Sequence, residues 1–470
     1  MKRLISLVLC LCVPVAALAD QKPPSTYDRA IAAGYKALTI CSGVFNAGRT
    51  PEQLSTLELK GIYPEYDAIV PMLTASVDKP RKIVSVPFDD ALAPRIAAWR
   101  PNLGCTQLPI GATADAVTAL PRFDAPRPKL DGKPWPLGDR KATGRVQGNA
   151  RALTRSVSAA FDRTQFGEGN ETTAVIVVQH GRIVAEKYRK DFGPNVAQRT
   201  WSVAKSLAGT LIGIAQHEGS IDPARPAAIA QWQMPGDPRA AITTDNLLRM
   251  ASGLHSTAAG NRTDALYFGG ATVDQDAAGS PALMPPGSTF RYANNDTVLA
   301  LRGLRERTGD DARALAFPFT QLLWKIGMTR TVPETDWRGN FVMSSQVWTT
   351  ARDLARLGLL YQNDGLFNGE RLLPEGWRQY VATPSGPQPP TGDFGYGATF
   401  WLLNRSPGIP ADTFGAFGNR GQYLIIVPSR SVVIVRRGED PTGARFDVAK
   451  FTAEILAALD SASTRTPTRH

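Results

Sequence analysis

Hydrophobic residues cover most of the circumference of the helix that residues 200–213 predict. They recur at the spacing of a helix buried inside a domain, and they are Val203, Ala204, Leu207, Ala208, Leu211, Ile214 and Ala215. Ser202 and Lys205 interrupt this apolar surface. Because they are separated by three positions they share a face, so the hydroxyl and the amine can meet. A buried lysine is costly when charged, and a lowered pKa would make it a proton acceptor beside the serine.

On the N-terminal side of this helix, the apolar pattern predicts a small α+β region followed by a hairpin. Helices are expected at 27–38, 52–59 and 150–163. Strands are expected at 68–73 and 82–87 around a turn at 78–80, and a hairpin is expected with strands 173–179 and 183–188 about a turn at 180–181. The hairpin leads through residues 191–199 into the apolar helix.

On the C-terminal side, the pattern predicts helices that alternate with a final set of strands. We expect a capped short helix at 243–250, helices at 296–307, 349–361 and 447–459, a strand at 396–403, and a hairpin with strands 423–427 and 432–436. Residues 256–285 are rich in Gly, Ala and Asp and predict a long loop or lid. The terminal strands would join the hairpin at 173–188 in one central antiparallel sheet flanked by helices, which is an α+β fold.

Prolines between residues 119 and 138 mark a boundary between two domains. We expect an N-terminal α+β region at 20–128, a linker or strap at 129–145, a larger domain at 146–461 and a flexible tail at 462–470. Residues 1–19 combine two basic residues, an apolar run too short to span a bilayer and the sequence Ala17-Leu18-Ala19, as a signal peptide does. We therefore expect export, to the periplasm of a bacterium, and no membrane segment after the signal is removed.

Composition and charge narrow the classes of function. The chain of 470 residues is 43% hydrophobic and carries a formal net charge of +11, but its Lys and Arg are scattered among Asp and Glu, so nucleic-acid binding is not indicated. Cys41 and Cys105 are the cysteines that remain after residue 19, and in an exported protein we expect them to form a disulfide. Two separately buried thiols are the alternative. Neither cysteine has a His or a further Cys near it in the sequence, so a metal site is not indicated.

The Ser-x-x-Lys and Tyr-x-Asn motifs each occur twice in the chain, so the surrounding sequence must show which copy belongs to a site. The Ser-x-x-Lys of Ser202 and Lys205 has a second copy at residues 76–79, which lies in the predicted turn and precedes Pro80. Tyr-x-Asn occurs at 292–294, behind a Pro-Pro-Gly turn, and again at 361–363, at the end of an amphipathic helix. The Pro-Pro-Gly turn before residues 292–294 is typical of a loop that directs its residues toward a site, so this is the copy that we expect to be functional.

Taken in order along the chain, the motifs resemble the serine β-lactamase-related superfamily. The stretches that carry the resemblance are 201–213, 250–254, 285–294, 349–354 and 418–422, within residues 145–461. Inside this superfamily the chain is similar to class C β-lactamases and penicillin-binding-protein-like serine hydrolases, to esterases, and above all to 6-aminohexanoate-dimer hydrolases. The resemblance implies a β-lactamase/transpeptidase-like fold, with a mostly helical subdomain beside the sheet and the small N-terminal α+β region outside it.

The resemblance also implies roles for individual residues. Ser202 would be the nucleophile, Lys205 the desolvated amine beside it, and Tyr292 the relay for protons to the leaving group. Asn294 would bind Lys205 and the substrate, and the backbone N–H groups of Ser202 and Asn419, in a strand that begins at Gly418, would form the oxyanion hole. The implied substrate is a small-molecule amide or ester, and no metal or cofactor is expected.

One departure from the family pattern concerns substrate choice. Where penicillin-recognising members carry Lys-Thr-Gly or His-Thr-Gly, this chain has Ala416-Phe417-Gly418, so a β-lactamase or a D-alanyl-D-alanine carboxypeptidase becomes the alternative rather than the first expectation. Arg420 could replace the missing cation, or it could have an exposed or structural role. A non-catalytic sensor or binding domain on the same fold is the alternative of another class. A Ser-His-Asp hydrolase is disfavoured because no Gly-x-Ser-x-Gly occurs.

Overall fold

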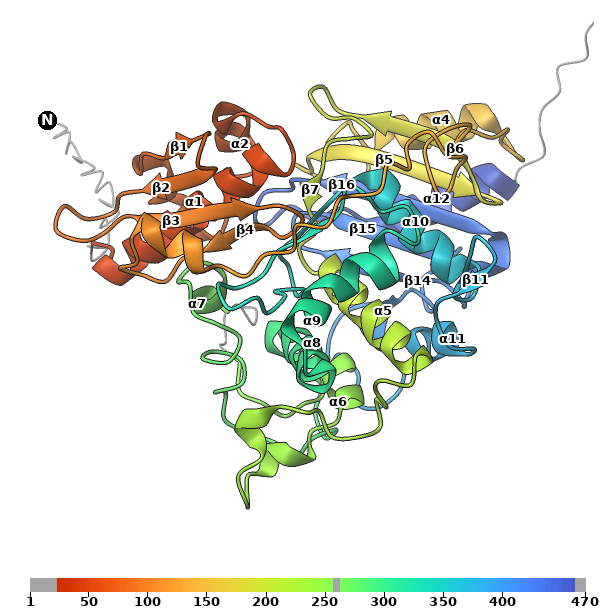
Figure 1. Cartoon of the computed structure of the whole chain (residues 1–470). Coiled ribbons are helices and arrows are strands. Elements are labelled where there is room, and N and C mark those ends of the chain that lie inside the picture. Colours follow the sequence, from red (N-terminus) through yellow and green to blue (C-terminus); the bar gives the residue numbers. More distant parts are fainter. Residues whose placement is uncertain (1–22, 257–262, 461–470) are drawn as a thin grey trace, which may run out of the picture.

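A seven-stranded antiparallel sheet forms the centre of the computed structural model, which describes residues 23–256 and 263–460 (Figure 1). The strand order is β12-β13-β14-β15-β16-β5-β6. The strands are β5 (Thr172–Gln179), β6 (Arg182–Tyr188), β12 (Gly395–Tyr396), β13 (Trp401–Leu402), β14 (Phe414–Gly418), β15 (Gln422–Val427) and β16 (Val432–Gly438). Val177 of β5 pairs with Ile434 of β16, so the early hairpin and the C-terminal strands close one sheet, and the predicted α+β fold is confirmed.

Helices cover both faces of this sheet, which explains why β5 is buried at every position. Val175 and Val177 pack with α4 (Ala150–Ala159) and α12 (Val448–Asp460), whereas Ile176 and Val178 face the larger core. That core includes α5 (Val203–His217) and α10 (Ala351–Gln362). A Cβ atom at Gly358 of α10 would lie 2.4 Å from a methyl carbon of Val433, so the glycine lets the helix approach the sheet closely.

Further helices form a mostly helical part below the sheet in Figure 1. They are α6 (Thr244–Leu248), α7 (Asp264–Tyr267), α8 (Asn294–Thr308) and α9 (Asp311–Phe317). The predicted cap of α6 is present, because the Thr243 side chain accepts a hydrogen bond from Asn246 N and the Asn246 side chain accepts one from Thr243 N. The remaining elements are α11 (Trp377–Ala382), the sheet of β7 (Gln198–Arg199), β9 (Val347–Thr349) and β8 (Val332–Pro333), and the hairpin of β10 (Leu366–Phe367) and β11 (Glu370–Arg371).

The N-terminal region is a four-stranded sheet packed against one long helix. Its elements are α1 (Thr26–Phe45), α2 (Pro51–Thr56), α3 (Pro64–Asp67), β1 (Ser76–Asp78), β2 (Ile83–Val86), β3 (Arg95–Arg100) and β4 (Gly104–Gln107). Cys41 of α1 and Cys105 of β4 form the expected disulfide. It ties the helix to the sheet that the helix covers.

Polar contacts join the N-terminal region and residues 129–145 to the larger domain. The buried Glu334 carboxylate accepts hydrogen bonds from Ser42 Oγ at 2.6 Å and from Cys105 N at 2.9 Å. Arg356 of α10 donates to the carbonyl oxygens of Pro136 and Gly138, at 2.6 and 2.8 Å. These bonds satisfy charged groups that would be costly to bury alone.

Several predicted elements differ in the structure. Residues 70–72 form a 3₁₀ turn rather than part of a strand, since Pro71 cannot donate to a strand ladder. The copy of Ser-x-x-Lys at 76–79 lies mainly in the edge strand β1, not in a turn. The expected strand 396–403 is two short strands, because Thr399 adopts a left-handed φ of 62° between them. Residues 419–421 are the turn between β14 and β15, not part of a strand.

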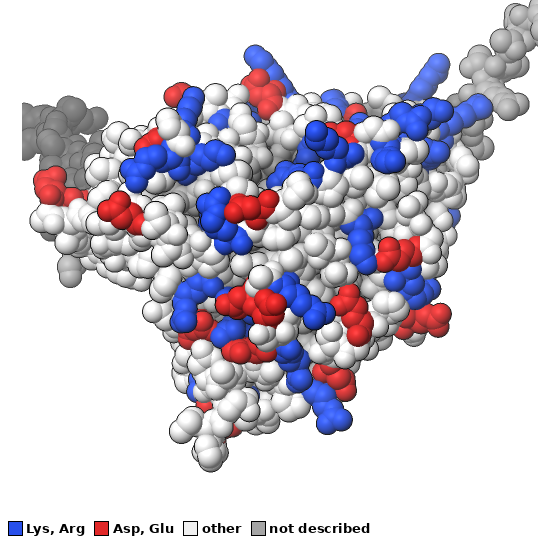
Figure 2. Space-filling model, viewed as in Figure 1, with Lys and Arg blue, Asp and Glu red and all other residues white. Residues whose placement is uncertain are grey.

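Some predictions concern residues outside the described ranges. The signal peptide and the tail lie there, as do residues 257–262 of the expected lid; the described remainder of that segment contains α7. None of the helices that the structure describes has the length and apolar composition that crossing a membrane requires. On the face drawn in Figure 2, Lys and Arg are interspersed with Asp and Glu, so the positive charge is not gathered into one area of this face.

Candidate active site

Ser202 stands directly before α5, at the end of a tightly turned segment. The preceding residue, Trp201, has a φ of 49°, which is unusual for a bulky side chain and requires support from its surroundings. That support comes from Arg199, whose guanidinium carbon lies 3.7 Å from the Trp201 ring centroid, and from Tyr63 of the N-terminal region, packed edge-on at 6.1 Å. The strained turn therefore fixes the position at which Ser202 enters the helix.

Lys205 is 1% exposed and contacts Ser202 as the sequence predicts. Its Nζ atom lies 3.1 Å from Ser202 Oγ, 2.6 Å from Asn294 Oδ1 and 3.0 Å from the carbonyl oxygen of Ser344. Burial lowers the pKa of Lys205 to about 7, an effect that the negative charge of Asp296 opposes. The amine can therefore lose its proton near neutral pH and accept one from the serine.

Tyr292 completes the group around Ser202 and Lys205. Lys205 Nζ lies 4.9 Å from the centroid of the Tyr292 ring, which packs against Trp401 at 5.3 Å and Tyr396 at 6.0 Å. Burial raises the pKa of Tyr292 well above its ordinary value, and hydrogen bonding to Ser202 acts in the opposite direction. Lys205 and Tyr292 thus have pKa values shifted apart, as expected for one group that accepts a proton and another that keeps it.

A buried carboxyl group lies behind this cluster and was missed by the sequence analysis. Asp296 follows Asn294 by two residues on α8, and its carboxylate accepts a hydrogen bond of 2.8 Å from Ser252 Oγ. Burial raises the pKa of Asp296 to about 7. Ser252 belongs to the 250–254 stretch, so the contact explains how that stretch supports the site. Ser344 had no recognisable signal, because only its backbone oxygen contacts Lys205.

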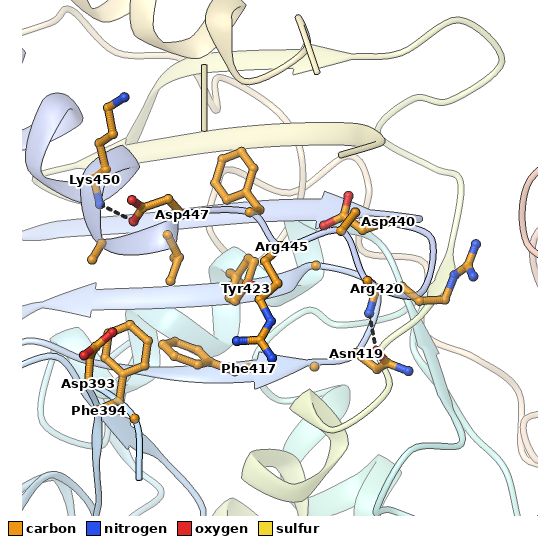
Figure 3. Close-up of a pocket in the computed structure, with 18 of the residues that line it drawn as sticks. Asp393, Phe394, Phe417, Asn419, Arg420, Tyr423, Asp440, Arg445, Asp447 and Lys450 are labelled. Carbon is orange, nitrogen blue, oxygen red and sulfur yellow. Dashed lines mark hydrogen bonds between the residues drawn. The ribbon is translucent and has the colours of Figure 1, made fainter. Parts of the chain in front are cut away.

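The turn after β14 brings backbone N–H groups to Ser202. A Cβ atom at Gly418 would lie 2.4 Å from the Thr200 carbonyl oxygen and 3.1 Å from Ser202 N, so only glycine permits this approach. Within the described part of the chain, the N–H groups of Ser202 and Asn419 have no protein acceptor. The Asn419 Oδ1 atom accepts from Arg420 N at 2.9 Å, as Figure 3 shows, which fixes the turn that carries the Asn419 backbone N–H.

Arg420 has a structural role, and the alternatives of an exposed or a substrate-binding cation are wrong. It is 5% exposed, and its Nε atom donates to Glu439 at 2.8 Å. Its other nitrogens donate to backbone carbonyls of the N-terminal region, which are those of Leu57, Lys60 and Gly61. Arg420 therefore holds the turn that carries Asn419 against the N-terminal region.

For the ester hydrolysis that the sequence predicts, we expect Arg420→Lys to lower kcat about tenfold with little change in KM, since small displacements of a donor reduce transition-state stabilisation. Lysine keeps the charge but cannot reproduce the planar set of hydrogen bonds that Arg420 makes. Steady-state kinetics would separate kcat from KM. Arg430→Lys, at the exposed turn on the other end of β15, is the matched control. Unchanged kcat in folded Arg420→Lys would contradict the positioning role.

A cavity of about 580 Å³ lies in front of Ser202. Its lining includes Tyr292, Asn294, Trp401, Phe417, Gly418 and Asn419, together with Tyr63 and Glu65 from the N-terminal region. The structure thus brings all the predicted site residues of the larger domain together. Tyr63 was not predicted, because nothing in the local sequence links it to the site. Among the described residues, no cluster of His, Cys, Asp and Glu could hold a metal ion.

Comparisons with known proteins identify the family of the larger domain. A family model described as Beta-lactamase matches residues 157–458. A 6-aminohexanoate-dimer hydrolase of Paenarthrobacter ureafaciens is 27% identical over 311 residues, which are 60% of this chain and 76% of the relative.

Solved structures share the fold. A D-stereospecific amidohydrolase from Streptomyces sp. has a TM-score of 0.51 at 16% identity, covering 66% of this chain and 98% of the other. A family VIII carboxylesterase also has a TM-score of 0.51 at 16% identity, with coverage of 67% and 98%. The predicted β-lactamase/transpeptidase-like fold is therefore confirmed.

Proposed function

Because the chain belongs to the Beta-lactamase family, we propose that it is an exported serine hydrolase that cleaves a small-molecule amide or ester through an acyl-enzyme on Ser202. The observation that carries the proposal is the buried Lys205 amine 3.1 Å from Ser202 Oγ. A lysine with a pKa near 7 can activate a serine without a histidine or a metal. The amide- and ester-cleaving relatives and structural neighbours support the choice of bond.

In the proposed acylation, neutral Lys205 accepts the proton of Ser202 as Ser202 Oγ bonds to the substrate carbonyl carbon. The carbonyl oxygen becomes negatively charged and is stabilised by the N–H groups of Ser202 and Asn419. When the tetrahedral intermediate collapses, the bond to nitrogen or oxygen of the leaving group breaks. Tyr292 gives that atom a proton and regains one from Lys205, so the cluster returns to its starting protonation.

Deacylation repeats these steps with water in place of the serine. Water loses a proton to the Lys205–Tyr292 pair as its oxygen attacks the acyl carbon, and the released Ser202 oxygen takes that proton back. Asn294 holds Lys205 Nζ in place, since its Oδ1 atom lies 2.6 Å away. The products are a carboxylic acid and an amine or alcohol.

The residues before Gly418 favour an amide or ester over a β-lactam. Ala416 is buried in β14, and Phe417 presents an aromatic ring to the cavity. Neither side chain offers the cation or hydroxyl that penicillin-recognising relatives place there. A β-lactamase, a D-alanyl-D-alanine carboxypeptidase and a non-catalytic binding domain are the alternatives, and the test below separates the first and the last of them from the proposal.

A fluorophosphonate probe tests the proposal directly. The wild-type protein should be labelled and should hydrolyse p-nitrophenyl esters or linear amide oligomers faster than nitrocefin, whereas Ser202→Ala should not be labelled. Ser76→Ala, at the other copy of the motif on β1, is the matched control and should be labelled like wild type. Absence of both labelling and turnover in the wild type would favour the binding domain. Preferential turnover of nitrocefin would favour the β-lactamase.

A further inference from the structure

A second cleft of about 1190 Å³ opens beside the catalytic cavity. The two share lining residues, which are Tyr63, Phe394, Phe417, Gly418, Asn419 and Tyr423. Figure 3 shows that the second cleft lies over β14 and β15 and extends toward the start of α12. A substrate attached at Ser202 can therefore continue into this cleft past the turn that carries Asn419.

Aromatic rings form a continuous surface from the catalytic tyrosine into the second cleft. Tyr292 packs against Trp401 at 5.3 Å, and Trp401 stacks on Phe417 at 5.9 Å with an angle of 13° between the rings. Phe417 contacts Tyr423 at 5.2 Å, and Tyr423 contacts Phe446 at 6.1 Å. Such a surface favours an apolar arm of a substrate, because it removes that arm from water.

Arg445 is a cation that lies beside this aromatic surface. Its side chain is exposed, makes no ion pair within the described part of the chain, and extends over Phe417 and Tyr423 in Figure 3. Among the other charged groups of the cleft, Arg420 pairs with Glu439, Asp440 pairs with Arg436, and Lys450 Nζ donates to Gln165 O. Asp447 accepts a hydrogen bond from Lys450 N, whereas Arg405 is exposed and, like Arg445, makes no ion pair with the described residues. Asp393 lies on the opposite side of Phe417.

We propose that the second cleft is a substrate subsite that takes an apolar arm ending in a carboxylate, with Arg445 binding the carboxylate and Phe417 and Tyr423 contacting the arm. This inference rests on the proposed hydrolase function and names a substrate class for it. A guanidinium binds a carboxylate through paired hydrogen bonds, and the aromatic floor keeps water from part of the arm. Arg445 would thus supply a carboxylate-binding cation to a chain whose residues 416–418 lack the Lys or His of penicillin-recognising members.

Matched pairs of substrates test the subsite. One pair varies the acyl arm, with p-nitrophenyl hexanoate and mono-p-nitrophenyl adipate, and the other varies the leaving group, with phenyl acetate and 4-acetoxybenzoate. In at least one pair, Arg445→Ala should lower the ratio of kcat/KM for the carboxylate-bearing to the neutral substrate by about tenfold. Arg445→Glu should lower it further, and added salt should reduce the wild-type ratio. Arg151→Ala, an exposed arginine on α4, is the control.

A binding measurement separates failure of the subsite from failure of the proposed function. Ser202→Ala should bind adipic acid monoanilide more tightly than hexanoic anilide in calorimetry, and adding Arg445→Ala should remove the difference. This result would support the subsite even if the wild type turned over none of the esters, an outcome that would itself contradict the hydrolase proposal. Ratios that Arg445→Ala leaves unchanged in both substrate pairs, together with equal binding of the two anilides, would overturn the subsite.

Discussion

Replacing Lys205 with methionine is expected to lower kcat/KM for ester hydrolysis by at least about a thousandfold, within the range for loss of a general base. Methionine fills a similar volume and needs no hydrogen bond, so the fold should persist while Ser202 loses its proton acceptor. Steady-state turnover and the rate of fluorophosphonate labelling would both measure the loss.

The pH dependence of wild-type activity is a second test of the role of Lys205 as the general base. Because Lys205 must be neutral to accept a proton, activity should fall as pH decreases through its pKa of about 7. The raised pKa of Tyr292 predicts no loss of activity from this tyrosine just above neutral pH. A profile of kcat/KM against pH would therefore rise through neutrality, and the slow residual activity of Lys205→Met should lack this rise.

Lys36→Met is the matched control for the methionine variant. Lys36 is also buried, in the N-terminal region, where its Nζ atom donates to the carbonyl oxygens of Val70 and Leu73 at 3.0 and 2.6 Å. Its replacement removes a buried amine far along the chain from Ser202, so the rise with pH should remain. If Lys36→Met lost activity to the same extent, or if folded Lys205→Met kept wild-type kcat/KM, the assignment of Lys205 as the base would be wrong.

Tyr292→Phe is expected to lower kcat/KM for amide hydrolysis by about 10²–10⁴-fold, since it removes the proton donor to the leaving group. The ring contacts with Trp401 and Tyr396 can persist, so the change is confined to the hydroxyl. The loss should be smaller for a p-nitrophenyl ester, because p-nitrophenolate leaves without protonation. Comparing one amide with one such ester in the same variant would measure this difference.

The second Tyr-x-Asn copy supplies the control for Tyr292→Phe. The Tyr361 hydroxyl is buried and lies 2.9 Å from Thr210 Oγ1, between α10 and α5. Tyr361→Phe should therefore cost some stability, measured as a lower Tm, while the amide-to-ester ratio stays as in the wild type. Equal losses for amide and p-nitrophenyl ester in Tyr292→Phe would argue against proton donation to the leaving group.

Local patterns were sufficient to predict the pair at the centre of the site. Ser202 and Lys205 share one helical face, and the spacing of residues on a helix fixes their proximity without reference to the rest of the chain. The hairpins β5–β6 and β15–β16 were likewise predictable, because short turns separate apolar runs. The assignment of catalytic roles to these residues remains a prediction that the variants above address.

Left-handed residues and long-range contacts account for what the sequence did not predict. Thr399 and Arg420 adopt positive φ values although neither is glycine. The sequence therefore predicted a continuous strand at each position, where the chain instead turns. Tyr63 and Ser344 reach the site through tertiary packing, at separations along the chain that no periodic pattern encodes. The buried role of Arg420 depends on carbonyl groups more than three hundred residues earlier in the chain.

The contacts of Arg420 bear on how this protein could have been assembled in evolution. The family match begins at residue 157, which suggests a hydrolase domain that is independent of the N-terminal region before it. Yet the turn beside Ser202 takes hydrogen-bond acceptors from residues 57–61 of that region. The two parts are therefore expected to diverge together, and exchange of either one between relatives would separate a buried guanidinium from its acceptors.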